Sequence, residues 1–446
     1  MRAARTPAAP RILPILRRLL TAPPAVQVVD AIARVMLGAP LPLAVRCWDG
    51  SERTAPGAPA LVVRNRRALR RIVYAPGELG LARAYVSGDL DIDGDVYAAL
   101  SLRDDLAARP DLRLDPRALA GLAGPLLRLG VLGPAPSPPP EEARLRGARH
   151  SSRRDREAIS HHYDVGNEFY ALLLGPSMVY SCAYYAELGA TLEQAQQAKL
   201  ELVCRKLDLR PGMRLLDVGC GWGSLALHAA ARHGVSVVGV TISKAQAELA
   251  HRRVAEAGLA ALVQIRLQDY RDVTDGPYDA ICSIGMAEHV GRAQLLGYAT
   301  GLHALLRPGG RLLNHAIARG PAAGIDRPNP RSFLTRYVFP NGDLQSLATH
   351  VAVLEEAGFE VRDVEGLRGH YALTCRAWGE NLERRWDKAV QLSSPGRARA
   401  WRIYLAGSAL SFERRRIGVN QVLALKANSS GPDPLPARRP DWSRRL

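Results

Sequence analysis

Glu288 and His289 stand side by side in the stretch CSIGMAEHVG, directly after a short apolar run. An adjacent acid and imidazole can act as a general acid/base couple or as two metal ligands. They can equally be polar residues that face water where a strand ends. The pair alone does not decide between these uses, so the elements that position it have to be found.

A glycine-rich segment, LLDVGCGWGSLALHAA, has the pattern of a strand, a loop and a helix. The strand ends at Asp217, and Gly219, Gly221 and Gly223 lie in the loop, where missing side chains permit a tight turn and the close approach of a ligand. A dinucleotide fold would need a glycine where Ser224 stands, and an acid after the next strand, where GVTIS has none. NAD is therefore disfavoured.

Strand-like and helix-like segments alternate after residue 160. The apolar runs are MRLLDV, VSVVGV, LVQIRL, YDAICSI and GRLLNHAI, and helical patterns begin near Ser224, Lys244 and Gln294. This alternation predicts an α/β catalytic domain over residues 160–430 with a doubly wound, mostly parallel sheet.

The other parts of the chain are smaller. Residues 1–132 predict an α+β module with strands in LPLAVRCWDG and PALVVRN, followed by helix, acidic turn and helix in LGLARAYVSGDLDIDGDVYAALSL. The acidic turn is no calcium loop, because position twelve from Asp89 is Leu100 instead of glutamate. Residues 133–159 predict a linker rich in proline and arginine, and residues 431–446 a basic tail.

The net charge of +17 favours contact with nucleic acid, an anionic membrane or acidic substrates, although a solvated basic surface gives the same composition. We find no nucleic-acid-binding motif. The six cysteines include no C-x-x-C pair, so we predict neither a disulfide framework nor a structural zinc site and assign no metal ligands. No apolar run is long enough for a transmembrane helix, and we expect a cytoplasmic protein.

Five further segments, in order, resemble the cyclopropane-fatty-acyl-phospholipid synthases, the mycolic acid cyclopropane synthase-like methyltransferases that use S-adenosylmethionine. They are SHHYDVGNEFYALLLGPSMVYSCAYY, GVTISKAQ, SIGMAEHVG, YVFPNGDLQS and RRIGVNQVLALK. The resemblance covers nearly all of residues 150–426 and, more faintly, the N-terminal module. It implies a seven-stranded class I methyltransferase sheet and transfer of a methylene group to the cis double bond of a phospholipid-bound acyl chain.

In that family a bound bicarbonate is thought to be the base that deprotonates the added methyl group, so that the carbocation closes to a ring. The family pattern assigns its binding to Cys182, Glu288, His315, the backbone of Ile317 and Tyr371. Glu288 would accept the bicarbonate O–H, while Tyr371 and His315 would supply donors. Each side chain could also be an ordinary core residue, as most free cysteines are. His289 has no family role and is expected to support the loop at a strand-to-loop step.

The resemblance assigns S-adenosylmethionine to Tyr180, Ser181, Asp217, Gly219, Gly221, Gly223, Thr241, Gln246, Gln268 and Asp269. Asp269 is expected at the adenine, and Gln246 at the ribose in place of the missing acid. Aromatic residues that could line the pocket of the cation are Tyr163, Tyr180, Tyr184 and Tyr185. Ser408 stands where many relatives have a cysteine, which puts any covalent route through that cysteine in doubt.

The implied partners are phospholipid acyl chains at an anionic membrane surface, at the inner face of the membrane, and a second copy of the chain in a homodimer. The basic clusters RNRRALRR at 64–71 and RRDR at 153–156 are candidate membrane contacts. Two other functions stay open. A relative can resolve the same cation to a methylene or methyl branch, and a small-molecule N-methyltransferase would not need the bicarbonate residues.

Overall fold

The computed structural model describes residues 22–107, 116–143, 165–320, 329–340, 342–428 and 440–442. The chain divides into two compact units, Met1–Pro140 and Glu141–Leu446, each of which is described by itself. The division falls inside the segment predicted as a linker. Tyr163 and the basic cluster at 153–156 lie outside the described residues. No helix in the described ranges is long and apolar enough to span a bilayer.

The first unit is an α+β fold around a four-stranded sheet in the order β2-β1-β3-β4. Its elements are α2 (Ala25–Leu37), β1 (Ala44–Cys47), β2 (Glu52–Arg53), β3 (Ala60–Val63), α3 (Arg66–Tyr74), α4 (Glu78–Val86), β4 (Leu90–Asp93), α5 (Val96–Ala107) and α6 (Pro116–Arg128). The predicted acidic turn is wrong, because Leu90–Asp93 forms a strand antiparallel to β3. Leu90 and Ile92 alternate with aspartates at the period of a strand, and Arg64 and Arg46 pair with those aspartates.

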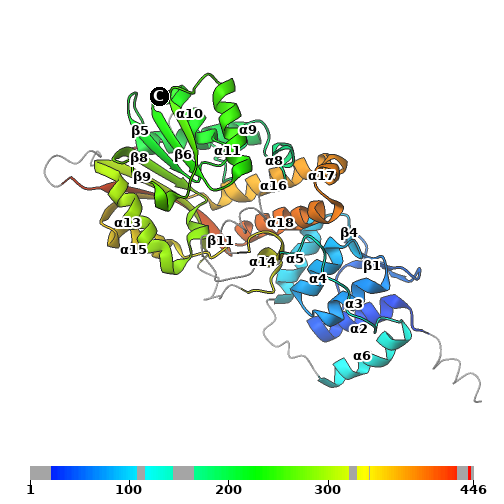
Figure 1. The fold of residues 1–446 in the computed structure, drawn as a ribbon. Coiled ribbons are helices and arrows are strands. Elements are labelled where there is room, and N and C mark those ends of the chain that lie inside the picture. The colour runs from blue at the N-terminus through cyan, green and yellow to red at the C-terminus, as the bar shows by residue number, and fades with distance from the viewer. Residues whose placement is uncertain are drawn as a thin grey trace, which may run out of the picture. The chain divides into compact units, whose positions relative to one another are not determined.

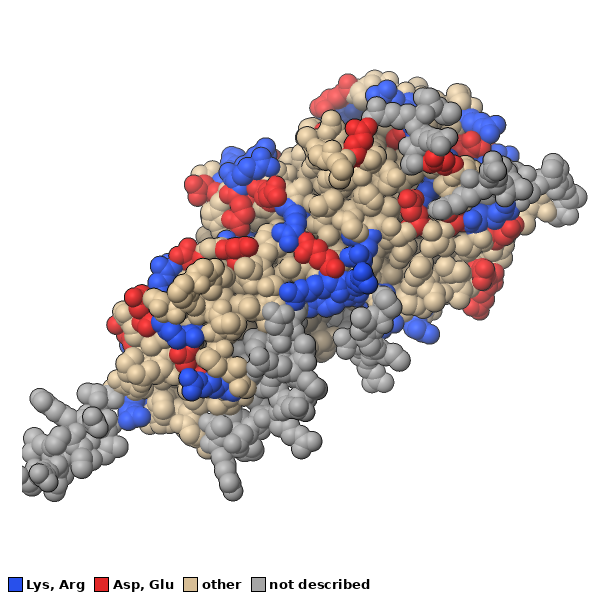
Figure 2. Space-filling model, turned by 180° about the vertical axis from the view of Figure 1, so that it is seen from behind, with Lys and Arg blue, Asp and Glu red and all other residues tan. Residues whose placement is uncertain are grey.

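Four arginines in the basic cluster at 64–71 bind groups of their own unit. The contacts are Arg64 with Asp91, Arg67 and Arg71 with Asp89, and Arg70 with the carbonyls of Gly130 and Val131. Figure 2 shows Lys and Arg interspersed with Asp and Glu over the face in view. In the sequence, residues 1–21 and 144–164 together contain eleven arginines and three acidic residues.

The second unit is built on a seven-stranded sheet in the order β10-β11-β9-β8-β5-β6-β7 (Figure 1). The strands are β5 (Arg214–Val218), β6 (Ser236–Thr241), β7 (Val263–Leu267), β8 (Tyr278–Ile284), β9 (Leu306–Arg319), β10 (Phe359–Gly366) and β11 (Ile417–Lys426). Neighbours from β7 to β9 pair in parallel, and only β11 runs the other way, antiparallel to both β9 and β10. The predicted doubly wound, mostly parallel sheet is confirmed.

Helices cover both faces of this sheet (Figure 1). The helices of this unit are α8 (Asn167–Leu174), α9 (Leu192–Leu207), α10 (Ser224–His233), α11 (Lys244–Glu256), α12 (Ala287–Val290), α13 (Leu295–Leu305), α14 (Phe333–Tyr337), α15 (Leu347–Glu356), α16 (Arg368–Arg384), α17 (Trp386–Leu392) and α18 (Pro395–Glu413). Consecutive residues of the central strand belong to different cores: Leu215 packs with the α9 and α10 side, and Leu216 with the α13 side. Burial on both faces explains the continuous apolar runs in the sequence.

Gly239 in β6 lies next to Cys220 of the glycine loop. A Cβ at this position would be 3.0 Å from Cβ of Cys220 and 3.1 Å from Cδ1 of Ile265. We expect Gly239→Ala to lower the free energy of unfolding by about 1–3 kcal/mol through overpacking. Gly297→Ala in α13, where a Cβ meets nothing within 4 Å, is the matched control and should raise it by about 0.5–1 kcal/mol.

Chemical denaturation of both variants beside the unchanged protein checks this pair. An unchanged midpoint for Gly239→Ala would mean that the loop and β6 can move apart without cost.

Candidate active site

A pocket lies at the carboxyl ends of the parallel strands β5, β6, β7 and β8, where open α/β sheets bind their ligands. Nine of the ten residues predicted for the cosubstrate line it, and they are Tyr180, Ser181, Asp217, Gly219, Gly221, Thr241, Gln246, Gln268 and Asp269. The tenth, Gly223, is not among the lining residues and caps the start of α10. The structure therefore brings together predicted residues from four separate segments.

The glycine loop after β5 is held by backbone hydrogen bonds. The N–H groups of Gly219 and Cys220 both donate to the carbonyl of Val240 at 3.0 Å, which ties the loop to the end of β6. Gly223 has a φ of 78°, in the left-handed region, and a Cβ there would lie 3.3 Å from Cβ of Ala250. Glycine is favoured at this position for both reasons.

Polar side chains at the next two strand ends already bind their neighbours. The hydrogen bonds run from Thr241 Oγ1 to Gln246 Oε1 (2.9 Å), from Gln268 Nε2 to the carbonyl of Asp272 (2.8 Å), and from Arg271 to the carboxylate of Asp269 (2.9 and 2.6 Å). Gln246 is thus preorganised beside Thr241, and a nucleoside that used the Asp269 carboxylate would share it with Arg271.

Lys199, on α9, is a pocket residue that the sequence analysis missed. Its side chain is buried, and Nζ donates to Oγ of Ser181 at 3.0 Å. Burial lowers the pKa of the Lys199 ammonium to about 8, against the opposing influence of Cys182 and Asp217. The one sequence signal for Lys199 is the segment AQQAKLELV, in which the lysine interrupts the apolar face of the helix.

Asp217 is the next-to-last residue of β5 and also lines the pocket. Burial raises the pKa of its carboxyl to about 6, although the Cys282 thiol donates to Oδ1 (3.3 Å) and Lys199 lies close enough to lower the pKa. Its Oδ2 is buried with no hydrogen-bond partner among the described residues. The pocket therefore contains an ammonium and a carboxyl of opposite charge at neutral pH.

Glu288 has one oxygen bound and one free. Oε1 accepts the backbone N–H of Ile317 at 2.7 Å, while the buried Oε2 has no partner in the described part of the chain. Burial raises the pKa of this carboxyl to about 7, and the Ile317 hydrogen bond only partly offsets the effect. The backbone N–H of Ile317, which the family pattern assigns to bicarbonate, therefore binds and orients Glu288 in this structure.

His315 lies two residues before Ile317 on β9, so the two side chains point to the same face of the sheet. Its Nδ1 is 3.3 Å from Nε2 of Gln421 on β11, and its buried Nε2 has no partner among the residues described. Burial lowers the pKa of His315 to about 3, so the ring is neutral at pH 7. An amide N–H donated to Nδ1 places the ring proton on Nε2, and His315 is then a donor.

Cys182 and Tyr371 complete the predicted set around Leu367, the residue before α16. The Cys182 thiol donates to the carbonyls of Ala183 (3.2 Å) and Leu367 (3.6 Å), and Leu367 in turn donates to Val419, which pairs with Ile317. Tyr371 is buried and stacks on Phe412 with 4.5 Å between ring centroids.

Burial raises the pKa of both the Cys182 thiol and the Tyr371 hydroxyl, so both groups are protonated. Glu288 and Cys182 are near enough to contribute to the shift at Tyr371. Hydrogen bonds and strand pairing thus link the five predicted residues through β9, β11 and Leu367 at the start of α16.

His289 is placed differently from the expectation. The stretch Ala287–Val290 is a short helix, α12, instead of a strand-to-loop step, so Glu288 and His289 point about 100° apart. Glu288 turns toward β9, while His289 lines the pocket and lies against Phe339, with 5.9 Å between ring centroids.

An aromatic cluster surrounds Tyr180. It consists of Tyr170, Tyr180, Trp222, Trp378, Trp401 and Tyr404, with centroids 4.8 to 6.0 Å apart in the contacting pairs. Of the tyrosines expected to line the pocket, Tyr184 and Tyr185 instead contact His370 and are not lining residues. Sequence reasoning missed the cluster's tryptophans: Trp222 lies in the glycine loop, and Trp378 and Trp401 come from the late helices α16 and α18.

Comparisons with known proteins agree with this fold. A family model described as mycolic acid cyclopropane synthetase matches residues 150–422. A probable fatty acid methyltransferase of Mycobacterium tuberculosis is 43% identical over 416 residues, covering 90% of this chain and 95% of the relative. The cyclopropane-fatty-acyl-phospholipid synthase of Escherichia coli is 35% identical, covering 84% and 90%.

A solved structure extends the comparison to three dimensions. A mycolic acid cyclopropane synthase complexed with SAH and CTAB is 35% identical and superimposes with a TM-score of 0.57, covering 61% of this chain and 98% of its own.

The raised pKa of Glu288 has a consequence for stability. The folded state binds a proton that the unfolded chain releases between about pH 4.5 and about pH 7, so ionisation of Glu288 destabilises the fold as the pH rises through this window. Glu288→Gln removes that effect. The free energy of unfolding of Glu288→Gln minus that of the unchanged protein should therefore be about 2 kcal/mol larger at about pH 8 than at about pH 5.5.

Urea denaturation at the two pH values measures the difference. Glu356→Gln, at an exposed position near the end of α15, is the control and should show no such trend. An equal effect of Glu288→Gln at both pH values would contradict a raised pKa.

Proposed function

Because the chain belongs to the mycolic acid cyclopropane synthetase family of S-adenosylmethionine-dependent methyltransferases, we propose that it makes cyclopropane fatty acyl chains. The reaction transfers a methylene group from S-adenosylmethionine to the cis double bond of an acyl chain on a phospholipid. The alkene attacks the sulfonium methyl, the carbon–sulfur bond breaks, and the thioether product leaves. Loss of one proton from the new methyl group then lets its C–H electron pair close the ring.

The observation that carries this proposal is the pair of buried atoms without partners, Oε2 of Glu288 and Nε2 of His315. Buried polar atoms are nearly always satisfied. Ile317 binds Glu288 and lies two residues after His315 on β9, so we infer that a small polar ligand binds both atoms. One atom accepts and the other donates, which fits bicarbonate, an anion with one O–H and further oxygen acceptors. When bound, bicarbonate would supply the base that takes the proton.

The chain's own residues do the rest of the work in this proposal. Glu288, fixed by Ile317, accepts the bicarbonate O–H, while the neutral His315 and the protonated Tyr371 donate to its oxygens. The protonated thiol of Cys182 is a further weak donor. Burial of all four side chains excludes water, which would otherwise capture the cation. Aromatic faces such as Tyr180 stabilise positive charge without acting as nucleophiles.

The polar patch at Lys199 and Asp217 suits the other end of the cosubstrate. S-adenosylmethionine carries an ammonium and a carboxylate on its methionine moiety. The Asp217 carboxyl matches the ammonium, and Ser181, polarised by Lys199, matches the carboxylate. Lys199 is then a positioning residue that acts through Ser181 and keeps Asp217 ionised.

A second product is supported by the names of the relatives. The relative with 43% identity is called a probable fatty acid methyltransferase, whereas the Escherichia coli protein is called a cyclopropane synthase. Both reactions share the first step and differ in the fate of the cation. A methylene or methyl branch is therefore the alternative, and it would not require the donor–acceptor pair at His315 and Glu288.

Mass spectrometry of the acyl chains tests the proposed product. The full-length protein is incubated with S-adenosylmethionine and cis-unsaturated phospholipid vesicles, with and without bicarbonate. We expect a gain of one CH₂ unit as a saturated ring, lost without bicarbonate and reduced by at least about a hundredfold in Glu288→Gln, a loss typical of catalytic electrostatic groups.

The other outcomes separate the alternatives. An exocyclic or branched product would replace the ring assignment, and no product on any lipid would overturn the substrate class. Anionic vesicles should give faster turnover than zwitterionic ones if the arginines of residues 1–21 and 144–164 bring the protein to the membrane. Equal rates would remove that part of the proposal.

The role of Lys199 is tested by binding. Lys199→Met keeps the length of the side chain but removes the ammonium, and we expect S-adenosylhomocysteine to bind about tenfold more weakly, equivalent to about 1.4 kcal/mol. Methylthioadenosine lacks the amino acid moiety and should bind equally well to both proteins.

Lys206→Met is the matched control, because Lys206 is equally buried on α9 but pairs with Asp363 and Glu365. It should lower stability without changing the affinity ratio of the two ligands. Equal losses for both ligands in Lys199→Met would show that the lysine only supports the fold.

A further inference from the structure

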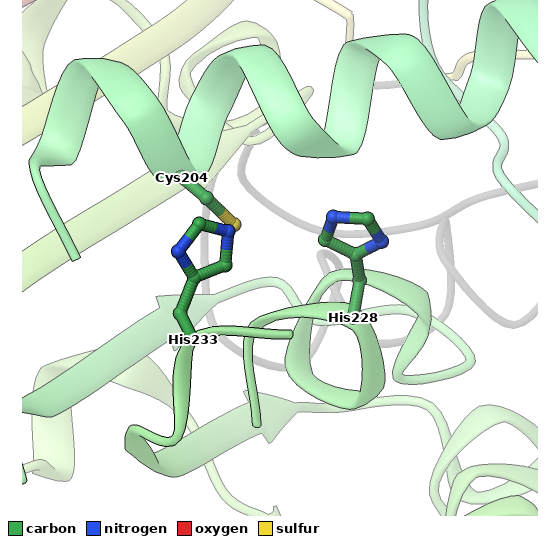
Figure 3. A group of neighbouring side chains, drawn as sticks. All are labelled: Cys204, His228 and His233. Atoms are coloured by element: carbon green, nitrogen blue, oxygen red, sulfur yellow. The ribbon is translucent and has the colours of Figure 1, made fainter. Parts of the chain in front are cut away.

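A group of metal-ligating side chains lies between α9 and α10. Glu201 and Cys204 are one turn apart on α9, while His228 and His233 come from α10, where His233 is the last residue. Figure 3 shows the two imidazole rings facing the Cys204 thiol. None of the four residues lines the pocket described above, so the reaction leaves this group unexplained.

The donor atoms are close together. One ligand atom from each of Cys204, His228 and His233 lies within 4.8 Å of the others. Oε2 of Glu201 is 3.1 Å from Nε2 of His228 and 3.2 Å from Nε2 of His233, so the carboxylate oxygen lies beside both histidines. Arg205 binds the other carboxylate oxygen, Oε1, at 2.8 Å and leaves Oε2 to the histidines.

We propose that Glu201, Cys204, His228 and His233 bind a zinc ion. Two imidazoles, a thiolate and a carboxylate form a tetrahedral donor set that zinc accepts, and softer or harder cations fit this mixture less well. Bond lengths of about 2.0–2.3 Å place zinc ligands about 3.3–3.7 Å apart, so the ligand atoms of Cys204, His228 and His233, which lie within 4.8 Å of one another, need to close by about 1 Å.

Charge balance favours the same ion. When zinc binds, the Cys204 thiol loses its proton to solvent and a zinc–sulfur bond replaces the S–H bond. Thiolate and carboxylate together then neutralise the two positive charges of the ion. Arg205 remains on the outer oxygen of Glu201, where it orients the ligand as an outer-shell partner does.

The position of the group suggests a structural role. The side chains of His228, His233 and Glu201 are 11%, 18% and 30% exposed, which gives an ion a route in, while Cys204 lies in the core shared by α9 and α10. Helix α9 carries Lys199, and α10 begins directly after Gly223. A zinc ion would fasten α9 to α10, the helix that follows the glycine loop.

This proposal revises the sequence-based expectation of no metal ligands. That expectation rested on the absence of C-x-x-C and similar local spacings. Here the ligands come in two pairs, three and five residues apart, on different helices, and only packing of α9 against α10 brings the pairs together.

Cobalt(II) is the probe, because a thiolate–cobalt bond gives a near-ultraviolet charge-transfer band and tetrahedral cobalt absorbs strongly in the visible. The full-length protein is stripped with a chelator, freed of it, and titrated without oxygen. We expect one equivalent of cobalt to produce both bands, zinc to displace it, and zinc to raise the thermal unfolding midpoint.

Variants assign the ligands. Cys204→Ser should remove the charge-transfer band, and His233→Asn, at a partly exposed position, should weaken zinc binding by at least about tenfold. Cys47→Ser changes a cysteine of the first unit and should leave both bands intact. Absence of the charge-transfer band in the unchanged protein, or its persistence in Cys204→Ser, would overturn the proposal and leave Glu201 as a hydrogen-bond acceptor for two histidines.

Discussion

The hydrogen bond from the backbone N–H of Ile317 to Oε1 of Glu288 determines the geometry of the candidate catalytic site. It joins the short helix α12 to the strand β9 and fixes the direction of the remaining oxygen, Oε2, inside the protein. A free carboxyl on a four-residue helix would rotate toward water, where it is better solvated. Because one oxygen is held, the other stays buried, and the pKa of Glu288 rises.

Burial has opposite effects on the titratable groups around this bond, and together they suit a cationic reaction. It raises the pKa values of Glu288, Cys182 and Tyr371 and lowers those of His315 and Lys199. Every shift moves a group toward its neutral form. A site of neutral donors with one carboxyl near its titration point can hold a small anion without offering a strong nucleophile to a carbocation.

The sequence predicts the parallel sheet and the cosubstrate pocket well because both depend on local patterns. Runs such as YDAICSI and the glycine loop are continuous in the chain, and parallel strands necessarily bring their carboxyl ends to one edge of the sheet. The predicted acidic turn at 89–95 failed because charged residues masked a strand whose aspartates are neutralised by arginines from neighbouring elements. Such pairing is a tertiary property.

Residues that act through tertiary contacts were also missed. Lys199 reaches the pocket only because α9 packs beneath Ser181, and Gln421 meets His315 only because β11 pairs with β9. The family resemblance supplied Glu288, His315 and Tyr371, yet it gave no reason for Ile317 to bind Glu288, which depends on α12 being helical. Local spacing carries no information about these partners.

The order of the strands also bears on how the protein is made. Strand β11 lies between β9 and β10, although it is the last of the three in the chain. Until residues 417–426 have been synthesised, β9 and β10 have no shared partner, and His315 has no Gln421 to set its proton. A ribosome-bound chain can thus complete the glycine loop and the central strands early, whereas the buried polar groups around Glu288 and His315 assemble only when synthesis is nearly finished.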